Sequence, residues 1–149
     1  MADRTSSSIT VAVPPAAVMG VIADFGAYPE WATGVSSAQI VADGPDGRAG
    51  QVRFVLDAGI IKDSYVLAYR WDGDAAVHWE LAAPGTMISE MSGGYLLEPD
   101  GGGTKVTYEL AVGLKVPMLG MLKRRAEKTI VDTALKGLRS RAEGRDGRG

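Results

Sequence analysis

The sequence predicts one α+β domain, in which a curved antiparallel sheet of about six to seven strands wraps around a long C-terminal helix. Between residues 35 and 112 the chain is mostly a series of short segments in which apolar and polar residues alternate, separated by turn sequences. Such alternation indicates half-buried strands, and strands joined by short turns are antiparallel neighbours. From Met118 to about Ala142 the chain has no proline. A helix of that length would span about 37 Å, enough to cover one face of the sheet.

The N-terminal segment predicts a strand followed by two short helices. Residues 8–13 alternate, and Pro14 and Pro15 end this strand because proline cannot donate to a ladder. Pro15 also suits the first position of a helix, because a backbone N–H there would have no partner within the helix. The apolar residues that follow have a helical period, which should end near Gly26, and residues 28–31 predict a second short helix or turn.

The later strands follow from the same alternation, and the glycine- and aspartate-rich segments between them predict turns. Gly93 and Gly94 fall inside a long strand, where they suggest a bulge or a sharp bend. In the C-terminal helix, residues that recur every four positions are expected to share one face. These patterns give strands at residues 35–41, 51–57, 62–71, 77–81, 87–98 and 105–112, and a helical face of Leu122, Ala126, Ile130, Ala134 and Leu138.

The chain length of 149 residues fits a single domain, with an ordered core at about 6–142 and a disordered tail at 143–149. A net charge of −2 argues against a nucleic-acid partner. No segment approaches the roughly 20 apolar residues of a membrane span, and the polar N-terminus does not resemble a signal peptide. We therefore expect a cytoplasmic protein without stable membrane insertion. The oligomeric state stays open, with a homodimer as one alternative.

The residue types present exclude several chemistries. There is no cysteine, so disulfides, thiolate metal sites and a cysteine nucleophile are excluded. His78 is the single histidine, and as the neighbour of Trp79 in a strand it should point to the opposite face, toward solvent. There is no calcium-binding loop, no nucleotide-binding loop and no Ser-His-Asp set. We expect neither a metal nor a cofactor.

The order of elements, together with the string IADFGAYPEW at residues 22–31, resembles the polyketide cyclase/dehydrase and lipid-transport family. This family belongs to the START-like superfamily, also called SRPBCC, whose fold is the helix-grip. Residues 77–81, 94–99 and 103–108 match it as well, and the resemblance covers about residues 6–142. It implies a cavity between the concave face of the sheet and the long helix. Family members bind lipids, quinones, hormones or polyketide intermediates, and many have no known activity.

The inward faces of the predicted strands carry large aromatic and adaptable side chains, which could line such a cavity or simply fill the core. Tyrosine offers an apolar wall with one hydroxyl, and methionine adapts to varied ligands. Residues 84–87 and 113–121, with Trp31, could form an entrance. Glu90 is a weak candidate for a catalytic acid or base, if its carboxylate faces the cavity; no other catalytic residue is expected. The candidate ligand-binding residues are Trp31, Phe54, Leu56, Tyr65, Leu67, Tyr69, Trp79, Leu81, Met87, Met91, Tyr95, Tyr108, Met118, Met121 and Leu122.

The function favoured by these residues is the binding or carriage of a hydrophobic small molecule, such as a lipid, a quinone or a polyketide-like compound. One alternative is an enzyme of the polyketide aromatase/cyclase type, which would hold a reactive chain in a bent shape. A second alternative is a protein-interaction module. Two or more polar groups converging deep in the cavity would favour the enzyme.

Overall fold

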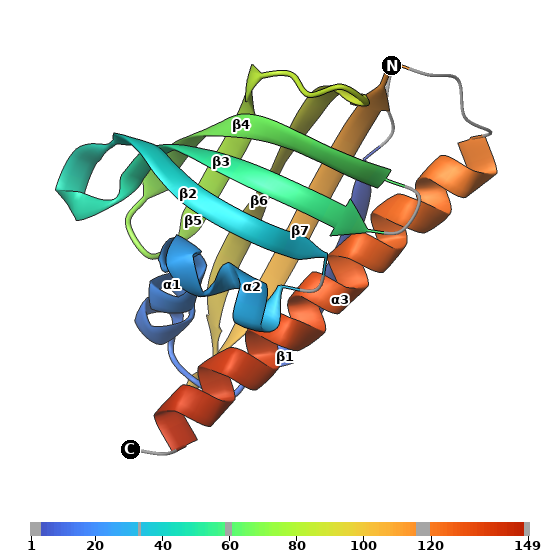
Figure 1. Ribbon diagram of the computed structural model, residues 1–149. Coiled ribbons are helices and arrows are strands. Elements are labelled where there is room, and N and C mark those ends of the chain that lie inside the picture. Colours follow the sequence, from blue (N-terminus) through green and yellow to red (C-terminus); the bar gives the residue numbers. More distant parts are fainter. Residues whose placement is uncertain (1–3, 33, 59–60, 116–119, 148–149) are drawn as a thin grey trace.

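The computed structural model describes residues 4–32, 34–58, 61–115 and 120–147. It consists of one seven-stranded sheet with a long helix lying across it (Figure 1). The elements follow one another as β1 (Thr5–Val11), α1 (Pro15–Ala23), the 3-10 turn η1 (Phe25–Ala27), α2 (Tyr28–Trp31), β2 (Val35–Asp43), η2 (Pro45–Gly47), β3 (Ala49–Ala58), β4 (Ile61–Asp72), β5 (Ala76–Ala83), β6 (Ile88–Asp100), β7 (Gly103–Leu114) and α3 (Gly120–Gly147).

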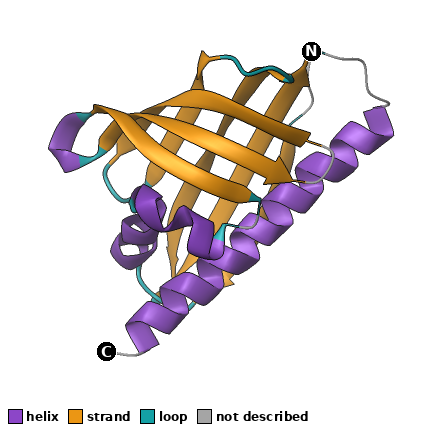
Figure 2. Cartoon of the chain, viewed as in Figure 1, coloured by secondary structure: helices purple, strands orange, loops and turns teal. Residues whose placement is uncertain are grey.

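The sheet is antiparallel throughout, with the strand order β1-β7-β6-β5-β4-β3-β2. Strands β2 to β7 form a meander in which each pairs with the next, and β1 is added beside β7, with Thr5 opposite Leu110. The sheet curves, and α3 runs across its open side next to α1 and α2 (Figure 2). This arrangement is the predicted helix-grip.

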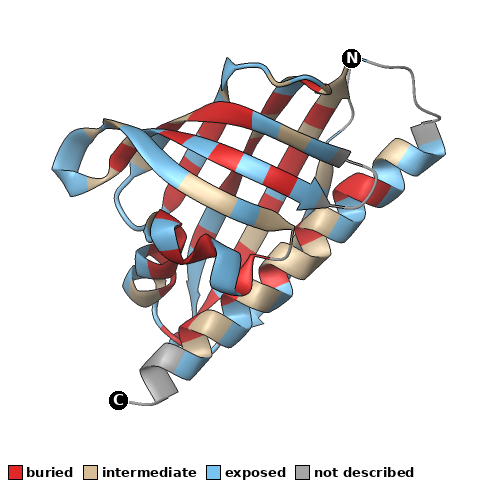
Figure 3. Ribbon diagram, viewed as in Figure 1, coloured by how far each residue is buried: buried red, intermediate tan, exposed pale blue. Residues whose placement is uncertain are grey.

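Helix α3 packs against the end of the sheet that β1 and β7 form. It contacts β1 and β7, and it also contacts α1 and α2. Along the strands buried residues alternate with exposed ones (Figure 3). The core therefore forms between the concave face of the sheet, α1, α2 and the buried side of α3, in the place where the sequence predicts a cavity.

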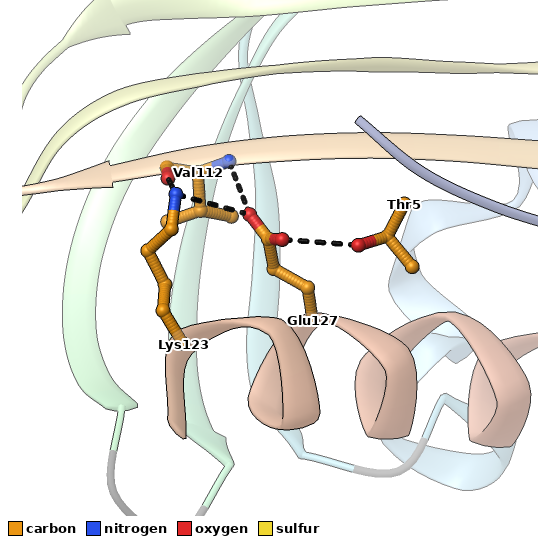
Figure 4. A network of polar contacts seen from close by, with 4 residues as sticks. All are labelled: Thr5, Val112, Lys123 and Glu127. Atoms are coloured by element: carbon orange, nitrogen blue, oxygen red, sulfur yellow. Dashed lines mark hydrogen bonds and ion pairs between the residues drawn. The ribbon is translucent and has the colours of Figure 1, made fainter. Parts of the chain in front are cut away.

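The buried carboxylate of Glu127 fixes α3 to β7, just beyond the part of β7 that pairs with β1. In the described chain β7 continues past Leu110, the last residue of β7 that pairs with β1. There Glu127 of α3 accepts hydrogen bonds from the backbone N–H of Val112 at 2.9 Å and from the hydroxyl of Thr5 at 3.0 Å. Lys123 donates to the carbonyl of Val112 at 2.8 Å, and its Nζ lies 3.7 Å from the Glu127 carboxylate (Figure 4). The two side chains thus complete the backbone bonding of Val112, which β1 does not reach.

The structure confirms every predicted strand and helix, with shifts of a few residues at the ends. Helix α3 extends past Ala142 to Gly147, into the segment predicted to be disordered, and Glu143 accepts a hydrogen bond from the N–H of Ala12. Residues 148–149 of that segment lie outside the described residues. Composition could not reveal that contact with the residue that follows β1.

The predicted bulge at Gly93 and Gly94 is wrong. The register of β6 runs unbroken through both glycines on both sides, and its irregularity lies between Ile88 and Glu90. The glycines are needed for space instead: a Cβ at Gly93 would lie 3.0 Å from the Trp79 ring, and one at Gly94 would lie 2.8 Å from His78. The backbone oxygen of Glu109 is nearer still to the first Cβ, and that of Val77 is nearer to the second, at 2.7 Å, so movement of the rings alone would not make room for a side chain.

Candidate ligand-binding cavity

A small apolar cavity lies between the concave face of the sheet and α3. Its volume is about 70 Å³, well below the roughly 300–1,000 Å³ of pockets that enclose drug-sized ligands. Aromatic side chains thus fill most of the interior. The cavity is lined by Tyr28, Trp31, Ala32, Val35, Phe54, Leu56, Tyr65, Leu67, Tyr69, Trp79, Met91, Tyr95, Tyr108, Leu110, Ile130 and Ala134.

The alternation of the strands brings the aromatic rings together. Cross-strand pairing places Phe54 opposite Tyr65, and Tyr69 opposite Trp79. Tyr95 lies opposite Tyr108 in the same way, with ring centroids 4.6 Å apart. Such pairs on one face of a sheet stabilise it by about 0.2–1 kcal/mol each. The result is a nearly continuous aromatic wall across β3 to β7.

The five tyrosine hydroxyls differ in their partners. Tyr28 donates to the carbonyl of Ile22. Among the described residues, Tyr65, Tyr69, Tyr95 and Tyr108 have no hydrogen-bond partner, and their hydroxyls are not sealed off from the cavity. These four hydroxyls can therefore bond to a molecule inside it.

Burial raises the pKa of all five tyrosines. Electrostatic interactions with other titratable groups raise the pKa further in Tyr28, Tyr65, Tyr69 and Tyr95. Tyr108 is one of the interacting groups in all four cases. Such interactions require the hydroxyls to lie near one another. The tyrosines are consequently neutral donors and acceptors at physiological pH, and they are poor bases.

The described part of the lining contains no Asp, Glu, His, Lys or Arg. The described residues also contain no group of acidic, histidine or cysteine side chains suited to a metal ion. The site can thus hold an apolar molecule and hydrogen-bond its oxygen atoms. It offers no side chain of the usual kind for removing a proton at neutral pH.

Comparison with known proteins places this geometry in a family. The family model for polyketide cyclase/dehydrase and lipid transport matches residues 2–143. The chain belongs to this family. None of the curated proteins has a sequence that matches the chain.

Two solved structures, a START superfamily protein and an aromatase/cyclase, have the same fold as this chain. A START superfamily protein from Mycobacterium smegmatis matches with a TM-score of 0.86 and 22% identity, covering 95% of this chain and 97% of its own. The Zhui aromatase/cyclase from Streptomyces sp. R1128 matches with a TM-score of 0.80 and 16% identity, covering 98% and 96%. The TM-scores establish the shared fold, whereas identities this low leave the ligand open.

The structure brings most of the candidate residues to the cavity. Leu81 is not in the described lining; it lines a depression on the outer side of the sheet, which Met91 also reaches. Met87 is half-buried outside the cavity lining. Met118 lies outside the described residues. The candidates that line the cavity are Trp31, Phe54, Leu56, Tyr65, Leu67, Tyr69, Trp79, Met91, Tyr95 and Tyr108.

The placement of Met121 and Leu122 at the cavity is wrong, because they lie on the solvent side of α3. Met121 is 67% exposed and Leu122 is 41% exposed. A helix turns about 100° per residue, so a step of four residues drifts by about 40°, and four such steps place Leu122 and Leu138 nearly opposite each other. The buried face instead follows the true period through Ala126, Glu127, Val131, Leu135, Leu138 and Ala142.

The weak catalytic candidate Glu90 is also excluded from the cavity. It is exposed and lines the outer depression, because its neighbour Met91 points inward. His78 is exposed, as its position beside Trp79 predicts. Of the predicted entrance, Pro84 and Gly113 line the same outer depression, and residues 116–119 lie outside the described residues.

Several lining residues were not among the candidates. Tyr28 lies in a helix of four residues, too short to show a period. Ile130 and Ala134 were expected on the buried face of α3, without assignment to the cavity. Leu110 follows the same alternation as Tyr108 and could have been found from it. The others are Ala32, directly after α2, and Val35, the first residue of β2.

Proposed function

We propose that this protein binds a hydrophobic small molecule in the aromatic-lined cavity and serves as its carrier or receptor. The observation that supports this most directly is the composition of the lining: apolar walls that carry a few hydroxyls with no partner among the described residues. Ligand sites typically combine these two features. Four tyrosines of this lining have hydroxyls that make no hydrogen bond to a described residue, so these hydroxyls are free to bond to a bound molecule.

The size of the cavity favours a compact ligand. About 70 Å³ is comparable to the space of two or three water molecules, each of which occupies about 30 Å³ in the liquid. A single ring needs modest side-chain movement, whereas a long acyl chain needs the helices and the sheet to move apart. The lining side chains that can move most easily are the flexible Met91 and three half-buried residues at the rim of the cavity: Val35, Ile130 and Ala134.

The rim also supports a route for the ligand between β2 and α3. Val35 on β2 and Ile130 and Ala134 on α3 line the cavity and are each partly exposed. Helix α3 has its main contacts with β1 and β7, at the other end of the sheet. The proposed route is therefore the side of the cavity that α3 covers least.

The proposal is tested by ligand recovery and by a matched pair of variants. Purified protein is extracted with organic solvent and analysed by mass spectrometry, and ligand-free protein is screened by thermal shift against lipids, quinones and polyketide-like aromatics.

Ala134→Trp fills the cavity from α3, and Lys136→Trp places the same side chain on the exposed face of that helix. We expect stabilisation of the wild type and of Lys136→Trp but not of Ala134→Trp. No stabilisation of the wild type by any compound would reject the proposal.

An aromatase/cyclase activity is the second candidate, and the adjacent rings of Tyr95 and Tyr108, whose centroids lie 4.6 Å apart in the cavity lining, favour it. Two neutral phenols could donate to a ketone oxygen and polarise it, while the aromatic walls hold the chain bent. Relatives with this fold include the Zhui aromatase/cyclase, although fold alone does not carry activity. Incubation with a poly-β-ketone surrogate, with Tyr95→Phe and Tyr108→Phe as controls, distinguishes catalysis from binding: an enzyme gives product that both variants lose, and a carrier returns the compound unchanged.

A further inference from the structure

The start of α3 exposes two apolar side chains. Met121 is 67% exposed and Leu122 is 41% exposed, whereas the other described apolar side chains of this helix are buried or half-buried. This end of α3 projects from one end of the molecule, and its first turns are largely exposed (Figures 1 and 3). Two exposed apolar residues alone need no explanation, so the charges around them decide what this surface can bind.

Positive charge is concentrated beside this apolar pair. The first nine residues of α3 include four basic side chains and one acidic side chain, in a chain whose net charge is −2. Of these side chains, Glu127 is fully buried, Lys123 donates to a backbone carbonyl of β7, and Lys128 has an ion-pair partner. Arg124 and Arg125 are exposed, and neither has a hydrogen-bond or ion-pair partner among the described residues. Their charges are therefore available to an anionic partner.

Arg125 lies next to both apolar side chains on the helix surface. It follows Met121 by four residues and Leu122 by three, which are the spacings of neighbouring side chains on a helix. At a rise of about 1.5 Å per residue, the two arginines lie about 4.5 Å further along the axis than the apolar pair. A helix that binds a bilayer surface buries its apolar side chains about 5–10 Å into the boundary between headgroups and acyl chains. The spacing therefore suits a surface in which the apolar pair enters that boundary while the arginines stay among the headgroups.

We propose that the start of α3 docks reversibly on an anionic lipid bilayer, with Met121 and Leu122 entering the apolar boundary and Arg124 and Arg125 binding headgroup phosphates. A nucleic acid would match the charge but would leave the apolar side chains in water. A second copy of the chain, related by a two-fold axis, would bring the same arginines together across the contact, which is unfavourable. The docking goes beyond the proposed binding function, and it does not require an occupied cavity.

Flotation with lipid vesicles tests the docking. Wild-type protein is mixed with vesicles of phosphatidylcholine alone or with about 30% phosphatidylglycerol, at about 0.1 M and about 0.5 M salt. We expect binding to the anionic vesicles at low salt. Binding should be at least about tenfold weaker at high salt, because salt screens exposed charges, and at least about tenfold weaker to the neutral vesicles. Circular dichroism checks that each variant is folded.

Two matched pairs of charge substitutions separate local docking from general attraction. Arg124→Gln with Arg125→Gln should weaken binding to the anionic vesicles about 25-fold, since each basic residue near such a surface contributes about fivefold. Lys136→Gln with Arg139→Gln makes the same change in charge at exposed residues of α3. These residues lie about 17 Å or more along the helix from the arginine pair, beyond the Debye length of about 10 Å. Their substitution should change binding less than about threefold.

The apolar half of the surface has its own control. Met121→Gln with Leu122→Gln should weaken binding to the anionic vesicles at least about tenfold, because the favourable burial of two apolar side chains is lost. Leu96→Gln makes the same kind of change on β6, at a leucine that is 45% exposed, and should bind like the wild type.

Wild-type protein that does not bind the anionic vesicles would overturn the inference. Equal losses in the two charge pairs, or wild-type binding by Met121→Gln with Leu122→Gln, would overturn it as well. Tighter binding to a DNA duplex than to the vesicles would assign the arginines to a nucleic acid. A wild-type dimer that the apolar substitutions convert to a monomer, measured by sedimentation, would assign the surface to a second copy. Either result contradicts docking on lipid, and neither alters the ligand screen that tests the proposed function.

Discussion

Gly137 of α3 lies directly against the backbone carbonyl of Trp31 in α2, so closely that a Cβ at position 137 would collide with that oxygen. The contact lets α2 dock on α3 at short range. One turn later, Arg141 of α3 and Glu30 of α2 form an ion pair at 2.7 Å. Together these contacts fix the end of α2 that carries Trp31 over the cavity.

Gly137→Ala should therefore destabilise the protein, although alanine is the better helix former. The lost close contact should lower the free energy of unfolding by about 1–3 kcal/mol, as overpacking does. Gly144→Ala on the same helix is the control, because nothing lies within 4 Å of its Cβ position. That variant should be unchanged or more stable by about 0.5–1 kcal/mol. Urea unfolding measures both, and equal stability of the two variants would show that the contact is not tight.

Glu127 should be essential for stability despite being an acidic residue on an amphipathic helix. Glu127→Ala leaves the N–H of Val112 without its acceptor and Lys123 without its counter-charge. We expect a loss of about 3 kcal/mol in the free energy of unfolding, as for other broken buried pairs. The exposed pair Lys128–Asp132 has the same i,i+4 spacing, and Asp132→Ala should cost no more than about 0.5 kcal/mol. Similar losses for the two variants in chemical denaturation would refute the role assigned to Glu127.

Asp63 should make the β5–β6 loop sensitive to acid. Its carboxylate accepts hydrogen bonds from the backbone N–H groups of Thr86, Met87 and Ile88. Burial acts to raise the pKa of Asp63, but these backbone donors outweigh it and lower the pKa below its usual value. The carboxylate stabilises the fold above the pKa of an unfolded aspartate, about 3.9, and this stabilisation is lost as the pH falls through the lower folded value.

The measurement for Asp63 is a comparison of Asp63→Asn with the wild type by urea unfolding between pH 7 and pH 2.5. The difference in the free energy of unfolding should be constant above about pH 5 and shrink toward acid. Asp100→Asn, at an exposed strand end, is the control and should differ little from wild type at any pH. A difference that grows toward acid would contradict the assignment.

The tyrosines should ionise only when the protein unfolds in alkali. The chain has five tyrosines, and burial raises the pKa of each above the ordinary value of about 10. Their neutral forms stabilise the folded state below that value, and stability is lost as the pH rises beyond it because the unfolded chain releases protons more readily. Absorbance at 295 nm should stay flat through pH 10 and then rise together with the loss of circular dichroism. A tyrosine that ionises near pH 10 in folded protein would show that its hydroxyl is solvated.

Much of the fold could be predicted because its signals are local. Alternation and turn sequences mark each strand, and Pro15 marks the start of α1. Tyr69, Trp79 and Tyr108 occupy the inward-facing positions of the same alternation. The aromatic part of the cavity could therefore be predicted. The face of α3 could not be taken from a repeat of four, since the rotation accumulates along a long helix.

Other features depend on contacts between distant parts of the chain, for which one sequence holds no signal. Glu127 looks like any solvated glutamate until the unpaired N–H of Val112 is placed beside it. Asp63 likewise gains its role only when the loop at Thr86–Ile88 folds back on it. The volume of the cavity depends on how side chains fill the interior, which residue types alone do not determine.

The central claim is that an apolar molecule binds between the sheet and α3, and an NMR titration with α-methylstyrene tests it most directly, because this probe makes no demand on any polar group. Chemical shift changes should cluster at Tyr69, Trp79, Tyr108 and Ala134 and saturate with one site. They should be absent at Arg4 and Ser89, which line the larger outer depression and do not adjoin a cavity residue in the chain. Changes confined to that depression, or none at the cavity residues, would contradict the account.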